Sequence, residues 1–258
     1  TITGTYGSLE MATDGKWTYT LDNADVETTA LSAGQQETDV LTVKSKDGTE
    51  KTVTVTITGA NDAATFGGDL TGDINEGGTT TTGTATVADV DSTAEFTANA
   101  SIAGTYGSLD MAANGAWTYT LDNGNATVDA LAAGATTVDT IGVTAADGTA
   151  QNIAVTITGV NDAATFGGNL TGAITENTAT TTGTATATDV DTGESSFTAN
   201  ASLAGTYGSL NMAANGAWTY TLDNGNATVD ALAAAATLTD TIGVTSADGT
   251  AQNVVVTI

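Results

Sequence analysis

Three observations predict an all-β protein built from tandem antiparallel β-sandwiches. Threonine alternates with large apolar residues in short runs such as Trp117–Leu121, the period-two pattern of a strand with one buried face. Asn-Gly and Asp-Gly dipeptides such as Asn114-Gly115, which tolerate the positive φ of a hairpin turn, separate such runs. Trp17, Trp117 and Trp218 stand 100 and 101 residues apart, so the pattern repeats about once per small sandwich. We therefore expect about seven strands per module in an elongated array.

The same spacing predicts the domain boundaries. Residues 1–58 are expected to be the C-terminal part of a first repeat, 59–158 a second complete repeat and 159–258 a third. The stretch Thr56–Gly68 returns almost letter for letter at Thr156–Gly168 and marks the two junctions. We interpret the chain as a window on a longer array.

The elements follow one order in each repeat. In the second, Phe66 and Leu70 are expected in an opening strand, residues 79–87 in a Thr-rich strand, and residues 96–102 in the next. A hairpin then carries the Trp and Tyr residues, for which core packing is the expectation. The Ala- and Leu-containing segment 126–133 suggests one short helical turn before the closing hairpin, which turns at an Asp-Gly dipeptide.

The charge is strongly one-sided. The chain has 30 acidic residues, four lysines and a formal net charge of −26, and no Lys, Arg or His follows Lys51. Acidic side chains beyond that point have only water, backbone amides or a bound cation to balance them. Nucleic acid and anionic membranes are poor partners for such a surface, because both need a basic patch. No apolar run is long enough to span a membrane, and the absence of cysteine excludes a disulfide framework.

Acidic residues recur in the loops that the predicted topology gathers at the junctions. In an up-and-down sandwich, the incoming linker, the loop after the second strand and the last hairpin turn share one end, whereas Glu76 lies at the other end and faces the next junction. Carboxylates 4–5 Å apart repel by about 3–4 kcal/mol per pair at an effective dielectric near 20, so a junction of this kind needs a cation. The candidate metal ligands are Asn61, Asp62, Asp89, Asp91, Asp147, Glu76, Asn161, Asp162, Asp189, Asp191 and Asp248.

The oxygen-rich ligand set favours Ca²⁺. Calcium accepts six to eight oxygen ligands in flexible geometry, whereas magnesium requires a tighter octahedron, and zinc would need histidine or cysteine. The alternative is that Asp-Gly and Asn-Asp serve only as turn residues, an interpretation that has equal weight for Asp147 taken alone. Asp122 and Asp139 are expected in loops at the end opposite the incoming linker, as weaker candidates.

Several motifs, taken together and in order, resemble the VCBS repeats of very large RTX-type bacterial surface adhesins. They are residues 104–109, 117–122, 130–134, 147–148, 157–163 and 186–191. The resemblance covers the whole chain and implies cadherin-like, immunoglobulin-like modules, an extracellular location at the bacterial surface, and calcium at the junctions. The chain departs from the family where Ala63-Ala64 and Ala163-Ala164 replace the usual proline after the linker.

The function expected is that of a non-catalytic stalk in an adhesin or biofilm matrix, stiffened by calcium between neighbouring repeats. One alternative is a subunit of a self-assembling filament or surface sheet, joined by strand addition between chains. Another is a calcium-dependent glycan-binding module; a cell-surface or glycan receptor would otherwise contact domains outside this segment. An enzyme is not expected, because there is no histidine or cysteine and no serine has a general base near it in the sequence pattern.

Overall fold

The computed structural model describes residues 1–258 and confirms the all-β class. Its two helices, α1 (Val26–Thr29) and α2 (Ala227–Asp230), have four residues each, and no helix has the length and apolar character needed to cross a membrane. The chain divides into two compact units. The first comprises residues 1–73, 79–121 and 138–156, and the second comprises 74–78, 122–137 and 157–258.

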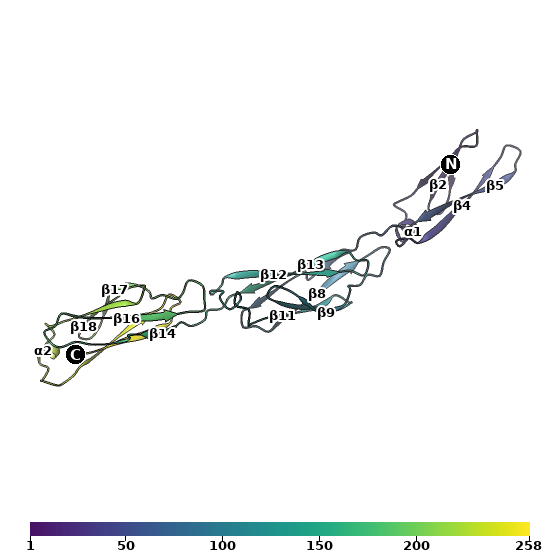
Figure 1. Cartoon of the computed structure of the whole chain (residues 1–258). Coiled ribbons are helices and arrows are strands. Elements are labelled where there is room, and N and C mark those ends of the chain that lie inside the picture. The colour runs from purple at the N-terminus through teal and green to yellow at the C-terminus, as the bar shows by residue number, and fades with distance from the viewer. The chain divides into compact units, whose positions relative to one another are not determined.

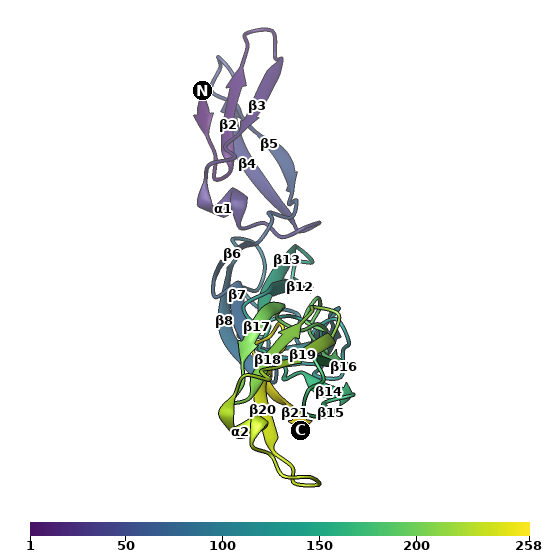
Figure 2. The ribbon, with the colours of Figure 1, turned by 90° about the vertical axis from the view of Figure 1, so that its left-hand side faces the viewer.

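The N-terminal part of the first unit contains two small sheets (Figures 1 and 2). One is a three-stranded sheet in the order β1-β2-β3, and the other is the β4–β5 hairpin. Leu9 and Leu41 are buried there, at 0% and 2% exposure. The strands are β1 (Ile2–Thr3), β2 (Gly7–Met11), β3 (Trp17–Leu21), β4 (Gln36–Lys44) and β5 (Glu50–Thr58).

The second repeat has a five-stranded sheet in the order β6-β8-β11-β10-β9 and a three-stranded sheet in the order β12-β13-β7. All five strands of the larger sheet belong to the first unit, whereas β7, β12 and β13 each run from one unit into the other. The strands are β6 (Thr65–Gly68), β7 (Thr71–Asn75), β8 (Thr80–Ala88), β9 (Asn99–Ala103), β10 (Gly107–Met111), β11 (Ala116–Leu121), β12 (Thr136–Thr144) and β13 (Ala150–Thr158).

The third repeat lies entirely in the second unit and has the same plan, with sheets β14-β16-β19-β18-β17 and β15-β21-β20. Figure 1 shows β14, β16, β17 and β18 around the C-terminal end of the chain. The strands are β14 (Thr165–Gly168), β15 (Thr171–Ala173), β16 (Thr180–Thr188), β17 (Asn200–Ala204), β18 (Gly208–Met212), β19 (Ala217–Leu222), β20 (Thr239–Thr245) and β21 (Ala251–Thr257).

The opening strand of a repeat is divided, which the sequence analysis did not predict. β14 pairs antiparallel with β16, but β15 pairs parallel with the last strand, β21, so the sandwich is not wholly antiparallel and has eight strands. The strand changes sheets at Gly168, whose φ of +69° suits glycine, and a Cβ there would lie 2.6 Å from Thr184 O. A single opening strand was expected because Phe66 and Leu70 are both apolar and compatible with one continuous strand.

The aromatic residues fill the core in the complete repeats. Trp218 and Tyr220 are 2% and 0% exposed, and Trp218 Nε1 donates to Asn169 O at 2.7 Å. The expectation of core packing is wrong for Trp17, which is 49% exposed. Trp17 lies on β3, which pairs only with β2, whereas β19 also pairs with β16, and Gly183 of that strand leaves room for the indole ring of Trp218.

Candidate metal centre

The Asp-x-Asp motif after the Thr-rich strand makes one hydrogen bond that is common to both complete repeats. Oδ1 of Asp89 accepts from the Asp91 amide at 3.0 Å, and Oδ1 of Asp189 accepts from the Asp191 amide at 2.9 Å. These bonds hold each loop as a tight turn in which the first carboxylate caps the backbone. The second oxygen of each first aspartate, Oδ2, is buried and has no hydrogen-bond donor.

The first linker, residues 59–62, joins this loop through the backbone. The Asp62 amide donates to Oδ2 of Asp91 at 3.1 Å, while Oδ1 of Asp91 is buried without a donor. Burial raises the pKa of Asp91, and the nearby charges of Asp89 and Asp62 raise it further, although the Asp62 amide bond partly offsets this. The linker therefore meets a carboxylate whose negative charge is incompletely balanced by the protein.

The closing turn of the second repeat also reaches the first linker. Oδ2 of Asp147 accepts from Asn61 Nδ2 at 3.1 Å and from the Ala64 amide at 3.2 Å. Hydrogen bonds from the hydroxyl and amide of Thr149, together with those from Asn61 and Ala64, hold the pKa of Asp147 well below its usual range. Asp147 thus differs from Asp89 and Asp91, because donors already occupy both of its oxygens.

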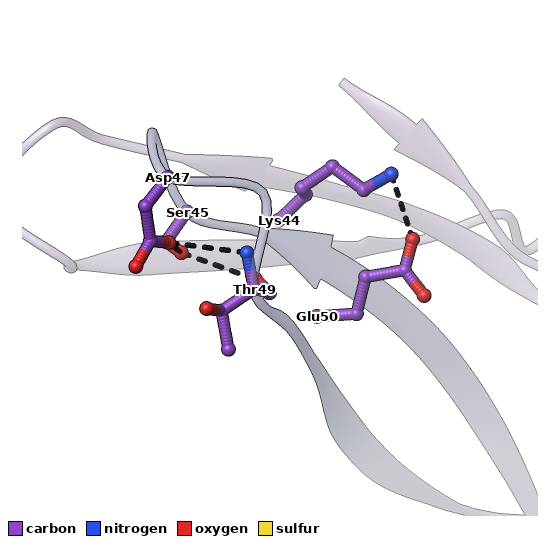
Figure 3. Close-up of polar contacts among 5 residues, drawn as sticks. All are labelled: Lys44, Ser45, Asp47, Thr49 and Glu50. Atoms are coloured by element: carbon purple, nitrogen blue, oxygen red, sulfur yellow. Dashed lines mark hydrogen bonds and ion pairs between the residues drawn. The ribbon is translucent and has the colours of Figure 1, made fainter.

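The corresponding turn of the first repeat shows this arrangement without a linker contact. In Figure 3, Asp47 accepts from the Ser45 hydroxyl and, at 3.1 Å, from the Thr49 amide, and these bonds lower its pKa. Beside it, Lys44 Nζ and Glu50 Oε1 form an exposed ion pair at 2.7 Å. The Asp-Gly-Thr sequence therefore forms the hydrogen-bonded turn on its own, and the turn at Asp147 makes contacts with the linker as well.

The second linker, residues 159–162, repeats the geometry of the first. The Asp162 amide donates to Oδ2 of Asp191 at 2.9 Å, and Oδ1 of Asp191 is buried without a donor on a residue that is 2% exposed. Asn161 Nδ2 donates to the carbonyl of Asp162 at 2.8 Å, as Asn61 Nδ2 does to the carbonyl of Asp62 at 2.9 Å, so each asparagine braces its linker.

Asp248 anchors the chain just after the second linker, as Asp147 does after the first. Its Oδ2 accepts from the Ala164 amide at 3.2 Å. Burial acts to raise the pKa of Asp248, but hydrogen bonds from Ser246, Thr250 and Ala164 outweigh it and hold the pKa well below the usual range.

A first acidic cluster of the second unit contains Glu76, Asp129 and Asp162. One carboxylate oxygen of each lies within 4.8 Å of the others. Glu76 Oε2 also accepts from the Val160 amide at 2.9 Å. Burial raises the pKa of Glu76 and of Asp162; the charge of Asp191 raises both, and the Val160 bond lowers that of Glu76. Three acids that lack a positive partner thus converge beside the linker.

A second cluster contains Asp189, Asp191 and Glu194, whose ligand oxygens also lie within 4.8 Å of one another. Glu194 Oε2 is buried without a donor, and burial together with the charges of Asp191, Asp189 and Asp248 raises the pKa of Glu194. Glu194 and Asp129 were not among the ligands predicted from the sequence. The extra residue that lengthens the tryptophan spacing from 100 to 101 lies near Glu194, so this insertion was a usable signal.

Asp139 lies elsewhere, and the expectation that it occupies a loop is wrong. It lies in β12, is 0% exposed and accepts from the amides of Thr105 and Tyr106 and from the hydroxyl of Tyr119 at 2.9 Å each. Its role is to hold a turn against the sheet. The signal was the Tyr–Asp spacing of 20 residues, which recurs as Tyr19–Asp39 and Tyr220–Asp240. Asp122 caps its own turn through the Gly124 amide at 3.0 Å.

The donor set of these loops fits Ca²⁺. The available ligands are carboxylate oxygens, and those without donors belong to Asp89, Asp91, Asp189, Asp191 and Glu194. A buried carboxylate oxygen without a donor is unfavourable unless something positive approaches it. No lysine, arginine or histidine occurs after residue 51 to do so, and calcium prefers flexible oxygen coordination.

The fold and the acidic loops together define a class of tandem cadherin-like β-sandwich repeats. The sequence matches the bacterial cadherin-like domain over residues 61–159 and again over 161–258, so the chain belongs to this family. No curated protein matches the sequence.

Solved structures of protocadherins share the fold. The extracellular cadherin domains 3–6 of protocadherin gamma B2 superpose with a TM-score of 0.51 and 15% identity, covering 96% of this chain and 61% of that one. The cis-dimer structure of protocadherin gammaB7 domains EC3–6 gives 0.50 and 15%, covering 99% and 62%. The chain thus spans about six-tenths of the length of these structures.

Proposed function

We propose that this chain is a non-catalytic repeat region of a large extracellular bacterial surface protein, an adhesin stalk or matrix component, whose linkers are stiffened by calcium. The observation that carries the proposal is the set of buried carboxylate oxygens without donors beside both linkers. The VCBS resemblance supports the assignment to surface adhesins of the RTX type. On this proposal the repeats are residues 1–58, 59–158 and 159–258, and each linker lies at the start of the repeat that follows it.

Stiffening follows from where the ligands originate. Asp162 belongs to the second linker, Asp191 to the loop after β16, and Glu76 to the segment after β7. A cation that binds ligands from all three segments restricts the linker, because rotation about the linker backbone would separate the oxygens. Without the cation, mutual repulsion of the carboxylates favours separation. Millimolar extracellular calcium is enough for sites with dissociation constants of about 10⁻⁴–10⁻³ M.

The test combines calorimetry with small-angle scattering on the whole chain. Isothermal titration should show calcium binding, and the melting temperature should rise with calcium. When free calcium is 100 times the dissociation constant of a single site, binding adds about 2.7 kcal/mol to the free energy of unfolding. In scattering, the maximum dimension of the chain should be larger in calcium than in a chelator, and the distribution of distances within the chain should be narrower. Magnesium at equal ionic strength is the control. Equal scattering in calcium and chelator would contradict stiffening, and no heat of binding would contradict the metal assignment.

A second candidate function, self-assembly by strand addition, is favoured by one observation. Trp17 is 49% exposed, and a groove of about 640 Å³ lined by Met11, Val43 and Lys51 lies in the same module. An added strand would cover β3 as β8 covers β11. Sedimentation velocity over a range of protein concentrations separates the two functions, since a stalk segment stays monomeric and a self-assembling subunit forms larger species.

A further inference from the structure

The loop after the Thr-rich strand differs between the two complete repeats. Five residues separate Asp191 from Phe197, but only four separate Asp91 from Phe96. The longer loop contains Gly193, whose φ of +91° is accessible to glycine, and the Glu194 amide then donates to Asp191 O at 3.3 Å. The insertion therefore turns the chain back and brings Glu194 to the Asp-x-Asp carboxylates.

Glu194 has no role in the fold that would explain this position. Its Oε2 is buried without a donor, and the ligand oxygens of Asp189 and Asp191 lie within 4.8 Å of its own. Asp191 is only 2% exposed, and its Oδ1 also lacks a hydrogen-bond donor. Three carboxylates that face one another without a base make the loop less stable unless a cation is present. The acid of the shorter loop, Glu95, is exposed.

A second difference between the repeats also adds an acidic residue at the second linker. Asp129 belongs to the acidic cluster at the second linker, whereas the corresponding residue of the first repeat is Thr29. The Thr29 hydroxyl donates to the carbonyls of Asp25 and Val26 at 3.1 and 3.2 Å, so it is committed to its own helix. The second linker thus has acids at three positions, Asp129, Glu194 and Glu76, for which the described residues give the first linker no acidic equivalent.

We propose that Glu194 is an additional calcium ligand, and that it makes the second linker bind calcium at a lower free concentration than the first. This inference rests on the proposed calcium function, and it adds the order in which the two linkers bind calcium. Calcium affinity rises with the number of charged ligands in a site, and one further carboxylate supports an increase of about tenfold. As calcium rises, the second linker becomes ordered first and the first linker follows.

The test is a calcium titration of the whole chain, using calcium chloride as the probe and two readouts. Calorimetry on the wild-type chain should resolve a tight and a weak class of sites. Amide resonances of Asp162 and Val160 should shift with the tight class, and that of Asp62 with the weak class. Glu194→Gln should weaken the tight class by about tenfold and leave the weak class unchanged. The matched control Glu95→Gln should change neither.

The outcomes distinguish this inference from the proposed function. If the wild-type chain binds calcium but Glu194→Gln leaves the tight class unchanged, or if the Asp62 amide shifts first, the role of Glu194 is wrong and the calcium function stands. If the wild-type chain binds no calcium, both are wrong. A melting curve in chelator verifies that Glu194→Gln is folded; we expect it to melt at a higher temperature than wild type, since one buried charge is removed.

Discussion

The amide of Asp162 donates to Oδ2 of Asp191 at 2.9 Å, and this bond ties the second linker to the Asp-x-Asp loop. The same bond joins Asp62 to Asp91 at 3.1 Å. In each case one oxygen of the carboxylate binds the linker backbone while the other is buried without a donor. A single side chain can therefore hold the linker and present a free oxygen to a cation.

Asp191→Asn should have opposite effects with and without calcium. In chelator, removing the buried charge should stabilise the chain by about 1 kcal/mol, or about 4–8 °C in the melting temperature of a small domain. In millimolar calcium the variant should melt below wild type, because a charged ligand is lost and affinity should fall at least about tenfold. Differential scanning calorimetry in both buffers measures this crossing, and the exposed Asp230→Asn is the control. Destabilisation of Asp191→Asn by a similar amount in both buffers would make Asp191 purely structural.

Asp147→Asn should cost more stability than Asp47→Asn. Both residues accept from a hydroxyl and an amide in their own turn, but Asp147 also accepts from Asn61 and Ala64 of the linker region. The folded-state pKa of Asp147 is depressed, so its contribution is complete above the unfolded value of 3.8 and is lost as the pH falls through the folded value. The melting temperatures of wild type and Asp147→Asn should approach each other as the pH falls from 7 towards about 2. A constant difference across that range would contradict the assignment.

Tyr220 should make the fold sensitive to alkali. Burial, followed by its hydrogen bond to Asp240 and the charge of Asp240, raises the pKa of Tyr220 above the usual 10.0. A raised folded-state pKa gives stability that is present below pH 10 and is lost as the pH rises from the unfolded value through the folded one. Alkaline unfolding followed by phenolate absorbance should therefore be cooperative. Tyr220→Phe should be about 1–3 kcal/mol less stable at neutral pH but lose less stability above pH 10; an equal loss would show that Tyr220 is not responsible.

Gly183→Ala should destabilise the third repeat. A Cβ at this position would lie 2.4 Å from Cζ2 of Trp218, whose ring is buried in the core. Overpacking of this kind costs about 1–3 kcal/mol, to be measured by chemical denaturation. Gly243→Ala is the matched control, because the nearest atom to its Cβ is 3.9 Å away, and it should be close to neutral. Equal stability of the two variants would mean that the Trp218 ring can move aside.

The sequence predicted the parts of this structure that depend on local patterns. Alternation of Thr with apolar residues indicated strands such as β19, and dipeptides such as Asn215-Gly216 indicated the hairpins, because both depend on side chains a few residues apart. It did not predict the division of the opening strand at Gly168, since a glycine between apolar residues is equally compatible with a continuous strand. The change of sheet depends on pairing of β15 with the last strand, β21, whose partner residues are 84 positions away in the chain.

Part of the candidate site was likewise predictable from the sequence, and part was not. Asn61, Asp62, Asp91 and Asp147 are brought together because the topology of a sandwich places their loops at one end. Asp139 was misplaced, since a charged residue in a strand looks like a loop residue until its three donors are known. Glu194 was not predicted, although the one-residue insertion beside it is visible in the sequence, because the turn at Gly193 that brings it to Asp189 and Asp191 appears only in the folded loop.

The close similarity of the repeats has a consequence for how the chain folds. Strands β8 and β16 both begin Thr-Thr-Thr-Gly-Thr-Ala-Thr, and each pairs with a strand of sequence Ala-Trp-Thr-Tyr-Thr-Leu, β11 or β19. An exchange of β8 and β16 between repeats would preserve the pairings with β11 and β19 and the contacts of Gly83 and Gly183 with the tryptophans, so these segments hardly discriminate against it. Synthesis from the N-terminus lets β8 find β11 before β16 exists, whereas refolding from denaturant presents both partners at once and should yield swapped species.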